Sequence, residues 1–126
     1  MKIKLTSVFV QNPIDAYKIY TEVLGFVSFM YMPEAMLAIV VSPEDQHGTA
    51  LMLEPNDNPI AKTYQEALFK AGIPVIVFGV DDIQKEYERL KQKGVQFRKE
   101  PQKTEWGTET DFEDGCGNLI KIHQDS

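Results

Sequence analysis

The sequence of 126 residues repeats one pattern of strands and helices after about 70 residues. Tyr17 recurs as Tyr87, in the middle of a helical segment in each half. Each of these helical segments stops at a glycine, Gly25 in the first half and Gly94 in the second. This repeat predicts a fold built from two copies of one small unit.

Periodicity and turn residues predict the same order of elements in both halves. In the first half, Asn12 and Pro13 are a typical helix start after a strand. The expected elements there are a strand at 3–10, a helix at 13–24, and strands at 26–31, 36–41 and 49–54. In the second half they are a strand at 75–80, a helix at 81–93, and strands at 95–99, 108–113 and 118–123.

We therefore expect one α+β domain over residues 1–126, made of two tandem βαβββ modules. The modules cover about 1–56 and about 73–126, and a helix at about 59–71 connects them. We expect their strands to form a curved mixed sheet around a central cleft. Alternation along the strands predicts which side chains line that cleft. They are Leu5, Ser7, Phe9, Met52, Glu54, Val75, Val77, Gly79, Leu119, Lys121 and His123.

The charge balance argues against two classes of partner. Lysine and arginine number 13 against 19 acidic residues, a net charge of -6, so neither nucleic acid nor an anionic membrane is expected as a partner. The single cysteine, Cys116, rules out an internal disulfide and indicates a reducing, cytoplasmic location. The sequence shows no secretory signal and no apolar run long enough to span a membrane.

Two local motifs at opposite ends of the chain resemble one known family. The segment VFVQNPIDAYKIYTEVLGF (8–26) is similar to that family's opening strand and helix, with Asn12 where Asp is usual. The segment FEDGCGNLIKI (112–122) is similar to its closing turn and strand. The sequence thus resembles the vicinal oxygen chelate superfamily of glyoxalases, bleomycin resistance proteins and dioxygenases. The resemblance implies the fold of paired βαβββ modules and a homodimer.

The resemblance also implies four positions at which metalloenzymes of this family hold a divalent ion. They fall on Leu5, Met52, Val75 and Lys121. None of these side chains offers an imidazole, carboxylate or thiolate, and a protonated lysine repels a cation. We therefore expect no metal and no cofactor, and metal-dependent glyoxalase or dioxygenase activity is not expected.

Three functions remain open at this point. The first is a metal-free small-molecule-binding protein, whose ligand the sequence does not name. The second is a metal-independent lyase or isomerase that uses Glu54, Lys121 or His123 as acid–base groups. The third is an interaction protein without a ligand. For the first, the expected ligand-binding residues are Leu5, Ser7, Phe9, Met52, Glu54, Val75, Trp106 and Lys121.

Overall fold

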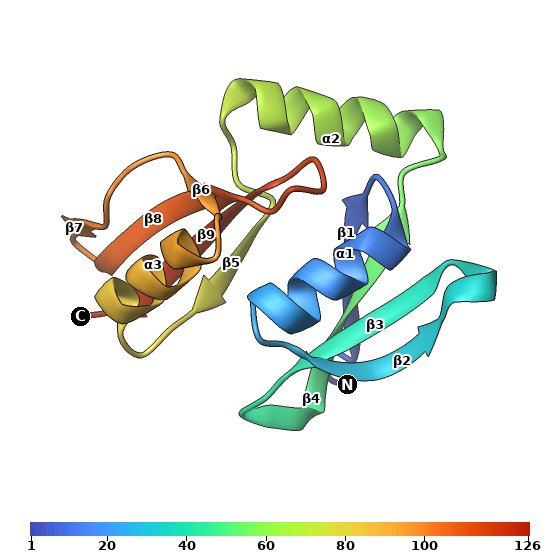
Figure 1. Ribbon diagram of the computed structural model, residues 1–126, viewed down its shortest axis with the longest axis horizontal. Coiled ribbons are helices and arrows are strands. Elements are labelled where there is room, and N and C mark those ends of the chain that lie inside the picture. Colours follow the sequence, from blue (N-terminus) through green and yellow to red (C-terminus); the bar gives the residue numbers. More distant parts are fainter. The chain divides into compact units, whose positions relative to one another are not determined.

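The computed structural model describes residues 1–126, and they divide into two compact units, 1–65 and 66–126. Each unit contains its own sheet (Figure 1). None of the helices is both long enough and apolar enough to cross a membrane.

The first unit holds a four-stranded sheet in the order β1-β4-β3-β2. Strand β1 runs parallel to β4, and the other neighbouring strands are antiparallel. The elements are β1 (Leu5–Val10), α1 (Pro13–Lys18), η1 (Ile19–Val23), β2 (Val27–Met32), η2 (Pro33–Ala35), β3 (Leu37–Ser42) and β4 (Asp45–Pro55).

The helix of this unit starts as the sequence predicts. The Asn12 side-chain oxygen accepts hydrogen bonds from the backbone N–H groups of Ile14 at 2.9 Å and Asp15 at 3.2 Å. The predicted helix of 13–24 is interrupted, however, because residues 19–23 form a π-helical turn. There the Leu24 N–H donates to the Ile19 carbonyl at 3.0 Å. The core of the unit contains Val8, Val10, Tyr20, Val40, Leu51 and Leu53.

Helix α2 (Pro59–Ala71) crosses the boundary between the two units. Within the first unit, the buried Gln65 side chain donates to the Phe9 carbonyl at 2.9 Å. It also accepts a hydrogen bond from the Asn56 side chain at 2.7 Å. These bonds fasten the first half of α2 to β1.

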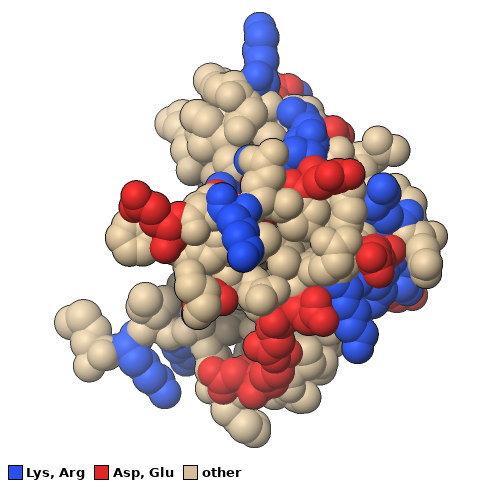
Figure 2. Space-filling view, turned by 90° about the vertical axis from the view of Figure 1, so that its left-hand side faces the viewer, with Lys and Arg blue, Asp and Glu red and all other residues tan.

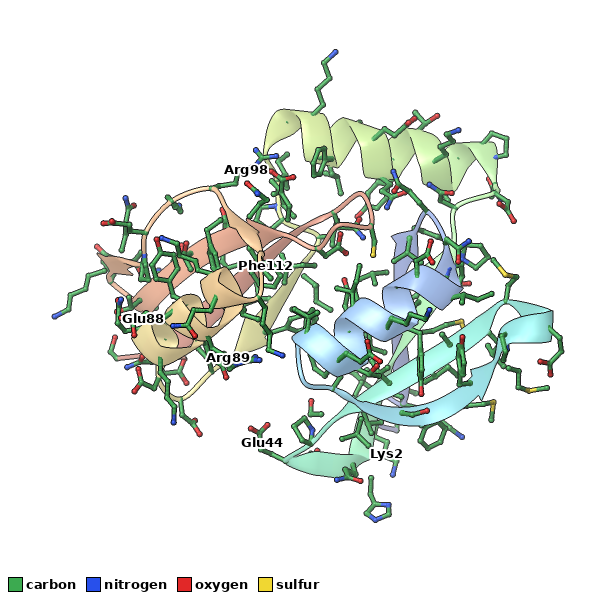
Figure 3. All side chains as sticks on the ribbon, in the orientation of Figure 1. Lys2, Glu44, Glu88, Arg89, Arg98 and Phe112 are labelled. Atoms are coloured by element: carbon green, nitrogen blue, oxygen red, sulfur yellow. The ribbon has the colours of Figure 1, made fainter.

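The second unit holds a five-stranded sheet in the order β5-β9-β8-β6, with β7 also paired to β8. Strand β5 runs parallel to β9, as β1 does to β4. The elements are β5 (Ile76–Gly79), α3 (Ile83–Gln92), β6 (Gln96–Phe97), β7 (Gln102–Thr104), β8 (Gly107–Glu113) and β9 (Leu119–Asp125). The buried Phe112, labelled in Figure 3, belongs to a core that also contains Ile83, Leu90, Ile120 and Ile122.

The two sheets therefore share one strand order, and the prediction of an α+β fold from paired βαβββ modules is confirmed. Besides the interrupted helix, several bounds differ from the prediction. Strand β1 begins at Leu5 rather than at residue 3, and the predicted strand at 95–99 is reduced to β6 (Gln96–Phe97). Strand β4 begins at Asp45, because the turn before it needs only Pro43 and Glu44. Strand β7 was not expected, since its three exposed polar residues show no apolar alternation.

Candidate functional site

The first sheet presents two chemically different faces. Along β1, Val8 and Val10 are buried, whereas Leu5 is 43% exposed. Along β4, Leu51 and Leu53 are likewise buried, and Met52 between them is partly exposed. The alternation predicted for these strands is confirmed. We call the face that carries Leu5 and Met52 the open face.

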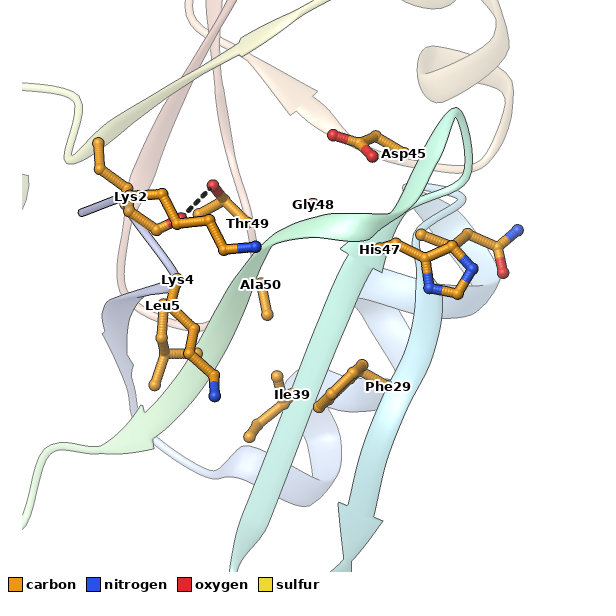
Figure 4. Close-up of a pocket in the computed structure, with 12 residues that line it drawn as sticks. Lys2, Lys4, Leu5, Phe29, Ile39, Asp45, His47, Gly48, Thr49 and Ala50 are labelled. Carbon is orange, nitrogen blue, oxygen red and sulfur yellow. Dashed lines mark hydrogen bonds between the residues drawn. The ribbon is translucent and has the colours of Figure 1, made fainter.

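A pocket of about 600 Å³ lies on the open face, at the end of the sheet where β1 and β4 begin (Figure 4). Lys2 and Glu44, labelled in Figure 3, lie at this end of the sheet. The apolar part of the lining comes from Leu5, Phe29, Ile39 and Ala50. The other lining residues are Lys2, Ile3, Lys4, Asp45, Gln46, His47, Gly48 and Thr49.

Hydrogen bonds fix the wall of the pocket that precedes β1. The Thr49 hydroxyl donates to the Ile3 carbonyl at 2.8 Å, the bond drawn in Figure 4. The Ala50 N–H donates to the Lys4 carbonyl at 3.0 Å. Across the pocket, the Asp45 carboxylate lies over Gly48, in the space that a Cβ at this position would occupy.

Phe29 reaches the pocket through an irregularity in β2. Ser28 pairs with Val40 and Met30 with Ile39, so Phe29 is an extra residue without a partner on β3. Such a bulge redirects a side chain that regular alternation would place elsewhere. The Phe29 side chain is 57% exposed and lines the pocket beside Ile39.

An apolar cluster supports the pocket from the same sheet. Ile39, Val41 and Ala50 are buried together, and Met52 packs against them with Val27 and Leu37. Of the predicted residues, Leu5 therefore lines the pocket, while Met52 belongs to the cluster beside it. Ser7, Phe9 and Glu54 lie further along β1 and β4, outside the pocket lining.

In the second unit, Lys121 lies in a charged cluster on β8 and β9. Its ammonium is 2.9 Å from the Glu109 carboxylate and 3.8 Å from that of Asp111. All three side chains are largely buried, and Asp111 Oδ1 has no hydrogen-bond partner. Since no other cation contacts Asp111, Lys121 is the charge that balances it.

These contacts keep both members of the main pair ionised at neutral pH. The hydrogen bond from Lys121 lowers the pKa of Glu109 from its ordinary value of 4.5, although desolvation opposes this. The same bond raises the pKa of Lys121 from its ordinary value of 10.5. Lys121 is therefore a fixed positive charge at neutral pH and is poorly suited to act as a base.

The other predicted site residues of the second unit are His123, Val75 and Trp106. His123 lies between two carboxylates, with Nδ1 3.4 Å from Glu109 and Nε2 3.3 Å from Asp125. Val75 precedes β5, and its N–H donates to the Leu119 carbonyl at 3.0 Å. Trp106 is 76% exposed, in the turn that joins β7 to β8.

The positions that the family resemblance assigns to metal ligands do not fit a metal ion. Leu5 and Val75 carry no donor atom, and Met52 offers only a weak thioether sulfur. The ammonium of Lys121 already neutralises the nearest carboxylates. Elsewhere, no group of three or more His, Cys, Asp or Glu side chains could hold such an ion.

Several of these residues were not predicted from the sequence. Glu109 and Asp111 alternate along the predicted strand 108–113, so a register for that strand would have placed them beside Lys121 and His123. Ile39 and Ala50 could likewise have been found from alternation. Phe29 could not, because its position depends on the bulge.

The chain combines two βαβββ units of the same strand order with an apolar pocket, and it has no group of side chains that could hold a metal ion. These features define a class of small proteins built from two paired modules. Residues 2–122 match the Glyoxalase/Bleomycin resistance protein/Dioxygenase superfamily, and the chain belongs to this superfamily.

Two proteins of Bacillus subtilis (strain 168) are similar over almost the whole chain. The uncharacterized protein YurT is 52% identical over 126 residues, which cover 98% of this chain and 99% of YurT. The uncharacterized protein YetH is 32% identical over 126 residues, 98% of each chain.

Solved structures also share the fold. UcmS2 is 28% identical with a TM-score of 0.81, over 98% of this chain and 97% of that one. TnmS3, an antibiotic binding protein from Streptomyces sp. CB03234, is 24% identical with a TM-score of 0.76, over 100% of this chain and 97% of that one. At this identity the likeness to TnmS3 concerns the fold alone.

Proposed function

We propose that the protein binds a small molecule without a metal ion and does so on the open face of the first sheet. The pocket carries this proposal. Its volume of about 600 Å³ lies within the usual range of small-molecule sites, roughly 300–1,000 Å³. Its apolar residues Leu5, Phe29 and Ile39 offer contact surface, and polar groups stand around them.

Two further observations support this proposal. Fold neighbours include a protein described as antibiotic binding. The assigned metal positions of the first unit carry Leu5 and Met52, which suit contact with an apolar ligand. As further ligand contacts we propose Ser7, Phe9 and Glu54 on the same sheet and Val75, Trp106 and Lys121 in the second unit.

The test uses N-phenyl-1-naphthylamine, an uncharged apolar dye that fluoresces in apolar sites. We expect it to bind the natural protein with the same Kd in the presence and absence of EDTA. Leu5→Asp should raise the Kd at least about tenfold, because the dye would then meet a charge within an apolar lining. Leu5 is 43% exposed, so this variant is expected to fold.

Ile60→Asp is the matched control, since Ile60 is 79% exposed on α2 and does not line the pocket. It should leave the dye Kd unchanged. Dye binding that needs a divalent metal or is unaffected by Leu5→Asp would contradict the proposed function.

A metal-independent lyase or isomerase is the second candidate, and His123 favours it. Its ring is largely buried between the Glu109 and Asp125 carboxylates, an arrangement that can orient a general base. Glu54 and Lys121 are the other acid–base candidates of this proposal, Glu54 in the first unit and Lys121 in the second. This candidate predicts EDTA-resistant solvent-deuterium exchange into small 2-oxo acids, lost in His123→Gln and retained in His47→Gln.

We also propose that the protein is a homodimer in the cytoplasm. Superfamily resemblance supports the dimer, and the lone Cys116, which is buried and makes no disulfide, suits a reducing compartment. Figure 2 shows basic and acidic side chains interspersed on one face of the molecule, and the net charge of the chain is -6. Neither nucleic acid nor a membrane is proposed as a partner.

A further inference from the structure

Two lysines stand on one side of the pocket without any carboxylate partner. Figure 4 shows Lys2 and Lys4 on the β1 side and Phe29 and His47 on the opposite side. Of the lysines and arginines, Arg89, Arg98 and Lys121 form ion pairs with carboxylates. No salt bridge involves Lys2 or Lys4.

The backbone that carries these lysines is held in place. The carbonyls of Ile3 and Lys4 accept the hydrogen bonds from β4 that form the pocket wall. A group bound by the two ammonium ions would therefore order only the lysine side chains and not the chain itself. Such preorganisation favours binding at this wall.

The local charge differs in sign from that of the whole chain. The pocket lining contains two lysines, Lys2 and Lys4, and one carboxylate, Asp45. The chain as a whole carries a net charge of -6. The Asp45 carboxylate lies against Gly48, across the pocket from the lysines. The lysine side of the pocket is therefore suited to an anionic group, and the side with Phe29 and Ile39 to an apolar one.

We propose that the ligand is an amphipathic anion, whose apolar body packs on Leu5, Ile39 and Phe29 and whose acidic group binds Lys2 and Lys4. This inference rests on the proposed function, because it names the ligand class of the same pocket. The remaining lining polar groups, among them Thr49 and His47, complete the edge of the site.

The experiment compares two dyes that differ by one sulfonate group. They are 8-anilinonaphthalene-1-sulfonate, an anion, and N-phenyl-1-naphthylamine, which is uncharged. We expect the anion to bind more tightly. The double variant Lys2→Gln/Lys4→Gln should raise the Kd of the anion about tenfold and that of the neutral dye less than about twofold. Added salt should weaken the binding of the anionic dye and leave that of the neutral dye unchanged.

The control variant is Lys62→Gln/Lys70→Gln, which removes the same charge from exposed positions on α2. It should leave both Kd values unchanged. An anion that binds no more tightly than the neutral dye, or that the Lys2/Lys4 variant does not weaken, overturns the inference and leaves the proposed function standing. Equal weakening of both dyes also overturns it. Failure of both dyes to bind the natural protein overturns the proposed function itself.

Discussion

At the scale of single residues, Lys121 determines the chemistry of the second sheet. The carboxylates of Glu109 and Asp111 lie side by side on β8, and the ammonium from β9 lies within 4 Å of both. Asp111 Oδ1 is buried without a hydrogen bond, and the ammonium of Lys121 is the cation that lies near it. Removal of the ammonium would leave two like charges close together in a partly dry site.

We predict that Lys121→Gln lowers the free energy of unfolding by about 1 kcal/mol at neutral pH, since a charge-assisted hydrogen bond is lost. The effect should depend on pH. The stability that comes with the lowered pKa of Glu109 is present above pH 4.5 and is lost as the pH falls below that value. The stability that comes with the raised pKa of Lys121 is present below pH 10.5 and is lost as the pH rises above that value.

Urea denaturation from acid to alkaline pH measures the difference in the free energy of unfolding between the natural protein and Lys121→Gln. It should be largest between about pH 5 and pH 10 and should narrow on both sides. Lys103→Gln, in the exposed strand β7, should match the natural protein throughout. A difference that does not vary with pH would count against the ion pair as its cause.

At the scale of elements, the contact between the start of β8 and the end of β9 depends on a glycine. Gly107 has a φ of +148° and pairs with Asp125. A Cβ at this position would overlap the Gln124 carbonyl and would lie 2.9 Å from the His123 ring. The two strands can approach closely here only because this residue has no side chain.

We predict that Gly107→Ala lowers the free energy of unfolding by about 2 kcal/mol or more, since backbone atoms cannot move aside as a flexible side chain can. Thermal or urea unfolding measures it. The matched control is Gly79→Ala in β5, where a Cβ would meet nothing within 4 Å. The control should change stability by less than about 1 kcal/mol. Equal effects at both positions would contradict this explanation.

At the scale of the whole molecule, one strand order serves two different surfaces. Both sheets place a parallel strand beside the last strand of the unit, β1 beside β4 and β5 beside β9. The open face of the first sheet is apolar, whereas β8 and β9 carry charged and polar groups. The repeated units have thus kept their topology and changed the residues that meet solvent or ligand.

The surface of the first unit is consistent with the proposed homodimer. Several large apolar side chains of the first unit are exposed, among them Phe29, Met30 and Met32 on β2. Exposed apolar surface of this kind often marks a protein interface. We expect light scattering to give a molar mass near twice the 14.3 kDa of one chain. A mass near 14.3 kDa at micromolar concentration would contradict the homodimer.

Local sequence patterns predict most of this fold and only part of the site. Caps, glycine stops and alternation predict α1, α3 and the long strands, because these features depend on neighbouring residues. The ion pair of Lys121 with Glu109 depends on the register between β8 and β9, which a single strand does not reveal. Lys2 and Lys4 precede β1, and no periodic pattern marks them as pocket residues.

The bulge at Phe29 separates the pocket from the packing of α1. Along β2, Tyr31 stacks on Tyr17 of α1 with ring centroids 3.8 Å apart, while Phe29 projects as an extra residue without a partner. Substitutions at position 29 can therefore alter the shape of the pocket with little effect on that stacking. A different side chain at position 29 would reshape one wall of the pocket and leave the attachment of α1 to the sheet intact.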